Sequence, residues 1–446
     1  MTRNLSRYSI SYTIILLPLV FSWFNGLSQV TNISGIINNY AQVTSLGQGS
    51  CIDSIFVAST AGFNVSDTIM LIQMKGAIID TTNTAAFGTI LNYNNAGNYE
   101  FSTIKSVGSN LIVINSSLIR SYNIGGILQL VRIPNFVDAN VVGTLSALSW
   151  NGIIGGILAF NVIGTLTLNA NIDMSDKGFR GGIAPPGSFN CNGSAFFYPI
   201  GSPDGGLKGE GIVELGNSKK LGRGAQANGG GGGNNNNAGG GGGSNFSSGG
   251  RGGDQVLYSS CLGLPIGGEA GKALSAIQSQ NKIFLGGGGG SGHQNDNNNQ
   301  GIHGKNGGGI IFFFANNIVG NGFSIKSNGT DNTQMPSTDG AGAGGAGGTL
   351  ILDVTNCTGT LNLEMNGGDG GSIDSPLYCL GVGGGGSGGV LYHKGNILPS
   401  NVSVSTIGGV CGTQINSSSS CYQSNWGGAN GQNGITLNNY LTPLGT

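Results

Sequence analysis

Short runs rich in β-branched and other apolar residues dominate the first part of the chain. These runs are residues 52–58, 68–74, 99–104, 111–114 and 127–133. Turn signals such as Asn94-Asn95-Ala96-Gly97 separate them, a pattern typical of β-strands. No stretch shows a sustained helical period. About a hundred residues of closely spaced strands predict a small barrel or sandwich, which we place at residues 29–140.

A strand unit recurs four times after residue 140. Each copy opens with a glycine pair and continues as strand, turn and strand. The copies are residues 155–174, 308–327, 347–366 and 388–407. In the first copy every second residue from Leu166 to Met174 is apolar, which is the period of a half-buried strand. The last three copies start 39 and 41 residues apart, and the first two start 153 apart. A stacked, solenoid-like β domain is therefore predicted for residues 141–446, with one long insertion.

Glycine is the most unusual feature of the composition. The chain holds 88 glycines in 446 residues, and 42 of them lie in the 132-residue insertion at residues 178–309. Collagen is excluded because glycine comes in blocks, such as residues 229–233 and 286–290, rather than at every third position. Flexible linkers and phosphate-binding loops are alternatives, but apolar residues punctuate the blocks and no GxxxxGK[ST] motif is present. We favour packed glycine helices of three residues per turn, similar to polyglycine II, for part of this insertion.

The N-terminus predicts export. Arg3 and Arg7 precede an apolar stretch at residues 14–24, which is shorter than the roughly 20 residues of a membrane span. We therefore predict a signal peptide at residues 1–28, cleavage between Ser28 and Gln29, and an extracellular or outer-surface location without a membrane span.

Disulfides are expected in such a compartment. The candidates are Cys191, Cys261, Cys357, Cys379, Cys411 and Cys421. The pairs closest in sequence are Cys411 with Cys421 and Cys357 with Cys379, but spacing leaves the connectivity open. Since the chain has seven cysteines, at least one is expected to be free.

Charge and chemistry restrict the function classes. The 18 basic and 19 acidic residues give a net charge of -1, so a nucleic-acid partner is not expected. His293 lies near Asp296, and Asp369 and Asp374 follow glycines in a way that resembles calcium-binding turns. We favour a solvated loop histidine at His293, and a single copy of the glycine/aspartate turn is a weak signal for calcium. We assign no catalytic, cofactor or metal residue, with calcium as the one ion left open.

Three further patterns suggest functions. Clustering of Asp173, Asp176, Lys177 and Arg180 would favour a polysaccharide-active enzyme on a β-solenoid. Thr165 and Thr167 suggest an ice-binding face, which we rank last because the later copies lack the pair. Several aromatic residues could bind sugars or a protein partner, although packing in the core is the commoner role. These are Trp150, Phe196, Phe197, Tyr198, Tyr378 and Trp426.

The chain also resembles a known group of proteins. The segments FNVSDTIMLIQMKGA (residues 63–77), NAGNYEF (95–101), GTLTLNANID (164–173) and KGFRGG (177–182) are similar to the N-terminal region of large secreted glycine-rich surface proteins of Bacteroidetes. Those proteins act in gliding and adhesion, and further modules and a sorting domain for type IX secretion commonly follow this region. The resemblance therefore implies a surface location and further modules or self-assembly.

These observations predict an exported all-β protein. We expect it to bind a surface glycan or a protein partner, or to act as a scaffold, rather than to catalyse a reaction. A polysaccharide-active enzyme is the alternative.

Overall fold

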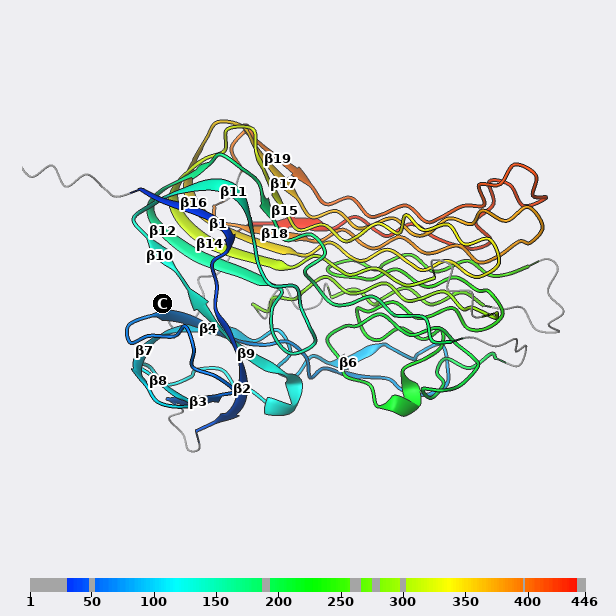
Figure 1. The fold of residues 1–446 in the computed structure, drawn as a ribbon, viewed down its shortest axis with the longest axis horizontal. Helices are drawn as coiled ribbons and strands as arrows, with labels where there is room; N and C mark the ends of the chain where they lie inside the picture. The colour runs from blue at the N-terminus through cyan, green and yellow to red at the C-terminus, as the bar shows by residue number, and fades with distance from the viewer. Residues whose placement is uncertain are drawn as a thin grey trace, which may run out of the picture.

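The protein is all-β and has two parts: a closed barrel, and a parallel sheet whose strands run on into glycine-rich segments (Figure 1). The computed structural model describes residues 30–47, 53–186, 193–256, 266–274, 281–296, 302–395 and 398–438. Within these ranges no helix is long and apolar enough to cross a membrane. The predicted cleavage site at Ser28 and Gln29 lies outside them.

Six antiparallel strands close the barrel in the order β2-β3-β8-β7-β4-β9. They are β2 (Tyr40–Leu46), β3 (Ser54–Val57), β4 (Thr68–Gln73), β7 (Tyr99–Val107), β8 (Leu111–Ile114) and β9 (Leu128–Ile133). Ile55, Ile69 and Leu130 are among the buried residues of its core. The predicted small barrel is confirmed. The apolar pattern missed β2 because only Ala41 and Val43 are buried in that strand.

The first strand that the structure describes belongs to the large sheet and not to the barrel. β1 (Val30–Ile36) pairs in parallel with β11 (Asp138–Ser146), and β10 (Asn135–Phe136) pairs with β12 (Ile157–Leu168). The barrel is therefore confined to residues 40–133, and the boundary that we placed at residue 140 falls inside β11.

Short elements lie in the connections. The hairpin β5 (Ile78–Ile79) and β6 (Ile90–Asn92) follows β4, and η1 (Ile124–Gly126) precedes β9. η2 (Asn217–Lys219) lies within the glycine-rich insertion. The hairpin extends from the barrel beneath the glycine-rich region (Figure 1).

The predicted repeat builds the large sheet. Its first row of parallel strands is β12, β14 (Ile310–Val319), β16 (Thr349–Thr358), β18 (Val390–His393) and β20 (Ile435–Leu437). The residues that follow the glycine pair in the four predicted copies are aligned across the row: Ile157, Ile310, Thr349 and Val390. The fifth strand, β20, escaped the sequence analysis because only one glycine, Gly434, precedes it.

A second row of strands completes each coil of the solenoid-like fold. These strands are β13 (Ile172–Asp173), β15 (Ser324–Lys326), β17 (Leu361–Glu364) and β19 (Val402–Ser405). The two rows meet at β11, which pairs with both β12 and β13. Apolar residues of both rows form one core cluster, in which the rings of Phe160 and Phe313 stack with centroids 5.2 Å apart.

The glycine-rich segments form an ordered array, here called the glycine lattice, that extends from the sheet (Figure 1). Successive amides along residues 230–233 donate to three different segments, and the fourth returns to the first: Gly230 N to Gly288 O (2.9 Å), Gly231 N to Glu269 O (2.8 Å), Gly232 N to Gly222 O (3.0 Å) and Gly233 N to Ser291 O (2.8 Å). These segments have three residues per turn, and their backbone hydrogen bonds are made to neighbouring segments. This is the predicted polyglycine II-like arrangement. The described glycine blocks are buried parts of the fold rather than flexible linkers.

An aromatic cluster joins the barrel to the sheet. The rings of Tyr99 and Phe101 in β7 lie 5.9 Å and 5.0 Å from the ring of Phe312 in β14. Phe284, from the glycine lattice, belongs to the same core cluster. One continuous apolar core therefore fixes the barrel against both the sheet and the lattice.

Candidate functional site

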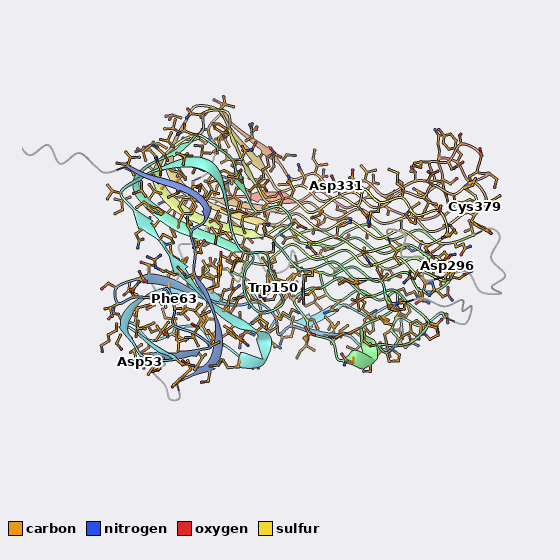
Figure 2. All side chains as sticks on the ribbon, viewed as in Figure 1. Asp53, Phe63, Trp150, Asp296, Asp331 and Cys379 are labelled. Carbon is orange, nitrogen blue, oxygen red and sulfur yellow. A yellow bond between two sulfur atoms is a disulfide. The ribbon has the colours of Figure 1, made fainter. Side chains whose placement is uncertain are left out.

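The end of the glycine lattice that lies far from the barrel is formed by three stacked loops, residues 333–339, 372–380 and 413–426. Figure 2 shows Cys379 at this end and the barrel residues Asp53 and Phe63 at the other. Hydrogen bonds connect the loops in sequence order: Asp374 N to Pro336 O (3.0 Å), Ile415 N to Ile373 O (2.9 Å) and Asn416 Nδ2 to Asp374 Oδ1 (2.8 Å). The loops are therefore held side by side.

A disulfide joins the second and third loops. It pairs Cys379 with Cys421, whose Cα atoms are 5.7 Å apart. Neither of the pairs closest in sequence forms, because Cys357 and Cys411 are both free. The two other candidates, Cys191 and Cys261, lie outside the described residues. Burial raises the pKa of the Cys357 and Cys411 thiols, which lowers their reactivity.

The same loops expose large apolar side chains, here called the tip residues. They are Met335 (54% exposed), Leu377 (66%), Tyr378 (40%), Ile415 (40%) and Tyr422 (47%). Apolar residues gathered on an exposed surface commonly mark an interaction site. Of the aromatic candidates, Tyr378 is therefore available to a partner, whereas Trp150 (2% exposed) and Phe196 (8%) are packed in the core.

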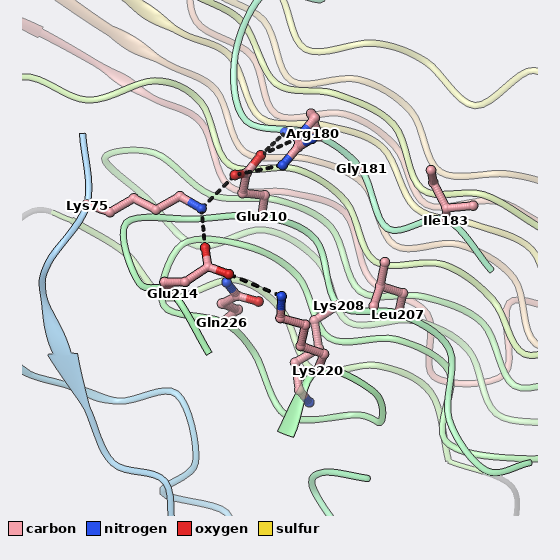
Figure 3. Close-up of a pocket in the computed structure, with 10 residues that line it drawn as sticks. All are labelled: Lys75, Arg180, Gly181, Ile183, Leu207, Lys208, Glu210, Glu214, Lys220 and Gln226. Carbon is pink, nitrogen blue, oxygen red and sulfur yellow. Dashed lines mark hydrogen bonds and ion pairs between the residues drawn. The ribbon is translucent and has the colours of Figure 1, made fainter. Parts of the chain in front are cut away.

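A second candidate site, which is polar, lies where the barrel meets the lattice (Figure 3). Lys75, which follows β4, forms ion pairs with Glu210 (2.6 Å) and Glu214 (2.7 Å). Arg180 pairs with Glu210 (2.9 Å), and Lys220 pairs with Glu214 (3.2 Å). These residues line a cavity of about 220 Å³. We call them the junction network.

The electrostatics of the junction network keep both carboxylates ionised. Burial raises the pKa of Glu210, but Lys75 and Arg180 lower it more strongly, to about 2. The pKa of Glu214 is also lowered, because Lys75 and Lys220 outweigh its burial. A general acid must carry a proton at the working pH, and neither glutamate does so near neutrality. The arrangement is suited to joining two parts of the fold.

A buried lysine lies beside this network. Lys208 Nζ donates to the carbonyl oxygens of Phe196 (2.8 Å), Gly222 (2.8 Å) and Gly224 (2.7 Å), which uses all three of its protons. Burial lowers its pKa. Its hydrogen bonds join the segment around Lys208 to Phe196 and to the segment at residues 222–224.

The charged residues that would favour an enzyme are dispersed. Arg180 belongs to the junction network, but Asp176 Oδ1 accepts from Thr330 Oγ1 (2.7 Å) and Lys177 Nζ donates to Ser149 Oγ (3.2 Å). Asp173 Oδ1 accepts from the amide of Ser175 (2.9 Å). Sequence reasoning missed Lys75, Glu210 and Glu214. The signal for them in the sequence is the pair Glu210 and Glu214, two acidic residues in a segment that is otherwise poor in charge.

The described residues include no group of three or more His, Cys, Asp or Glu side chains able to hold a metal ion. His293 is buried, its Nε2 lies 2.9 Å from Pro203 O, and burial lowers its pKa to about 4. It is a core residue and not the solvated loop residue that we expected. Asp369 Oδ1 accepts from Val410 N (2.7 Å) in the next coil.

The chain has only weak similarity to known proteins. No family model and no curated protein matches the chain. Two solved structures have weak similarity to it. The tailspike protein gp49 from Pseudomonas phage LKA1 is 13% identical with a TM-score of 0.16, and the match covers 86% of this chain and 63% of that one. The Gp54 tailspike of Acinetobacter baumannii bacteriophage AP22, solved in complex with A. baumannii capsular saccharide, is 10% identical with a TM-score of 0.16, and the match covers 85% and 58%. The chain thus spans less than two thirds of either tailspike.

Proposed function

We propose that the protein is an exported cell-surface adhesion protein in which the glycine lattice presents the tip residues to a glycan or protein on another surface. The observation that carries the proposal is the position of Leu377, Tyr378 and Tyr422. They are exposed on loops that the Cys379–Cys421 disulfide joins, at the end of an ordered lattice. Aromatic side chains on a constrained surface bring contact area at a small entropic cost.

The lattice is suited to act as a stiff spacer. Its backbone bonds run to neighbours in three directions, so bending it would break bonds in several segments at once. The coils place successive loops next to one another at the far end. Sequence changes in these loops would alter the contact surface without disturbing the lattice.

Export and surface location are part of the proposal. A disulfide favours an oxidising compartment, and the predicted signal peptide at residues 1–28 provides a route out of the cytoplasm. The resemblance to surface proteins of Bacteroidetes is consistent with this location.

Binding without catalysis is also proposed. Canonical glycoside hydrolysis needs one protonated and one ionised carboxyl group. In the junction network the pKa values of Glu210 and Glu214 are both lowered by ion pairs. These two carboxyl groups are therefore unsuited to supply the proton.

The experiment measures retention of the fluorescently labelled chain, residues 29–446, on bacterial cells and on a glycan array. A Leu377→Ser/Tyr378→Ala/Tyr422→Ala variant should lose at least about tenfold in retention, as expected when central aromatic contacts are removed. Ile163→Ala is the matched control, since Ile163 is 66% exposed but lies on β12. Equal retention of the tip variant, or release of sugar ends from a polysaccharide, would contradict the proposal.

A further inference from the structure

A cleft lies between the barrel and the first row of sheet strands. It is separate from the cavity of the junction network. Its volume is about 530 Å³, which lies within the range of small-molecule sites. It is lined by Thr68, Phe101, Ser102, Thr103, Ile133, Asn135, Asn161, Phe314, Asp353 and Lys394. We call it the interdomain cleft.

The barrel wall of the cleft is one row across three strands. Thr68 in β4 is paired in register with Thr103 in β7 and with Ile133 in β9. These side chains therefore lie next to one another on the outer surface of the barrel. Phe101, from β7, is 4% exposed and forms part of the apolar floor.

The sheet wall takes one residue from each repeat. Asn161, Phe314 and Asp353 are neighbours in register on β12, β14 and β16. Lys394 follows β18, and its Nζ lies 3.0 Å from Asp353 Oδ1. All four are the fifth residue after the glycine pair of their copy. Adjacent strands are about 4.8 Å apart. The repeat therefore places these side chains about 4.8 Å apart along the wall, with a different residue in each copy.

The polar groups form a chain along one side of the cleft. Asn135 Nδ2 donates to Thr68 Oγ1 (3.1 Å), and Asn161 Nδ2 donates to Asn135 Oδ1 (3.2 Å). These bonds connect the barrel wall to the sheet wall. The apolar floor lies beside them, where the rings of Phe101 and Phe314 are 6.0 Å apart.

We infer that the interdomain cleft binds a neutral oligosaccharide. A sugar ring presents C–H groups on its faces and hydroxyls at its rim, which match an aromatic floor beside amide, hydroxyl and carboxylate groups. The spacing of side chains along the sheet wall is close to the length of one ring in a sugar chain. The charges of Asp353 and Lys394 cancel, so the lining offers no net attraction to a polyanion.

A peptide strand fits less well. Peptides that bind to sheets usually add to an exposed edge, where unpaired backbone groups are available. Both walls of the interdomain cleft are faces of paired strands. Their backbone groups are already used within the sheet and the barrel.

This inference goes beyond the proposed function, because the cleft is lined by strands of the barrel and the sheet (β4, β7, β12 and β14), which lie at the opposite end of the molecule from Cys379 (Figures 1 and 2). The test is isothermal titration calorimetry of the full chain with cellohexaose, maltohexaose, laminarihexaose and xylohexaose. At least one should bind with a dissociation constant of about 1 mM or tighter. Hexagalacturonic acid, which is anionic, should bind more weakly than that sugar.

The variants locate the binding. Phe314→Ala should weaken affinity at least about tenfold and Asn161→Ala about threefold, since each removes one contact. Thr103→Trp adds a large side chain to the cleft from an exposed position, so it should abolish binding and leave the core intact. It therefore tests the inference even if the Phe314→Ala variant does not fold. Asn317→Ala is the control, because Asn317 lies on β14 but pairs with Asn356 outside the cleft (3.0 Å).

The outcomes separate this inference from the adhesion proposal. The tip variant should bind the hexasaccharide as the unchanged chain does. The inference is overturned if none of the four neutral sugars binds, if only the anionic sugar binds, or if Phe314→Ala and Thr103→Trp fold and leave the affinity unchanged.

Discussion

A Cβ atom on Gly230 would overlap the carbonyl oxygen of Gly241. The two residues belong to neighbouring segments of the lattice, and Gly241 N in turn donates to Gly231 O (2.8 Å). Neither Gly230 nor Gly241 has a positive φ, so the backbone conformation itself would accept any residue. Glycine is required here because the adjacent backbone occupies the place of a side chain.

Alanine at Gly230 should therefore destabilise the protein strongly. The added methyl group has no free space, and we expect a loss of at least about 3 kcal/mol in the free energy of unfolding. Gly216→Ala is the control, because Gly216 has φ of -64° and no atom of another segment lies within 4 Å of its would-be Cβ. Urea denaturation followed by circular dichroism measures both. Similar midpoints for the two variants would show that the lattice is not closely packed.

The junction network makes stability depend on pH. The pKa of Glu210 is about 2 in the folded protein and about 4.3 in an unfolded chain. The stabilisation is therefore present above the unfolded value and is lost as the pH falls from about 5 to 2, by about 3 kcal/mol. Because Trp150 Nε1 donates to Glu210 Oε2 (3.0 Å), tryptophan fluorescence during unfolding at several pH values reports the change.

Glu210→Gln should remove most of this dependence. The variant should be about 3 kcal/mol less stable at pH 7, because Lys75 and Arg180 lose a buried anionic partner. Glu364→Gln is a suitable control: Glu364 pairs with Lys326 at 3.6 Å with both side chains partly exposed, and such pairs contribute about 1 kcal/mol or less. An unchanged acid transition in Glu210→Gln would assign the pH dependence to other groups.

Lys282 connects the lattice to a barrel loop. Its Nζ donates to Asn94 O (2.7 Å), Ala96 O (2.9 Å) and Asn98 Oδ1 (2.7 Å). Lys282→Met should leave the Asn94 and Ala96 carbonyls without this donor, whereas Asn98 Oδ1 still accepts from Arg120 Nη1 (3.2 Å). The change should cost about 2 kcal/mol or more and speed proteolysis within residues 92–98. The exposed Lys105→Met is the comparison. Equal cleavage rates in both variants would mean that Lys282 does not hold the loop.

The disulfide at the tip should act locally. Cys379→Ser/Cys421→Ser should speed proteolysis within residues 372–380 and 413–426 and reduce retention on cells, because two of the three tip loops lose their covalent link. The lattice should keep its circular dichroism spectrum. Cys357→Ser, a substitution of a free cysteine, should change neither property. Unchanged cleavage in the double variant would show that hydrogen bonds alone hold the loops.

Local patterns predicted most of the scaffold. Short β-rich runs between turn signals identified five of the six barrel strands, and the glycine pairs identified four aligned strands of the sheet, because both patterns are local to a single strand. The weakest patterns were missed: β2 buries only Ala41 and Val43, and β20 follows a single glycine.

The repeat period also carries information about the disulfide. Cys379 and Cys421 are separated by 42 residues, close to the spacing of 41 between the last two copies. Residues one coil apart lie side by side in a solenoid, so this spacing pointed to the observed pair. The shortest separations in sequence did not point to it.

Strands, their repetition and the close packing of glycine segments can all be read from the order of residues. These are short-range properties of spacing and steric size. The tertiary structure decided that Lys75 meets Glu210, that Phe101 faces Phe314, and that β1 leaves the barrel for the sheet. Each of these contacts joins segments more than a hundred residues apart, and it depends on how the barrel docks against the coils.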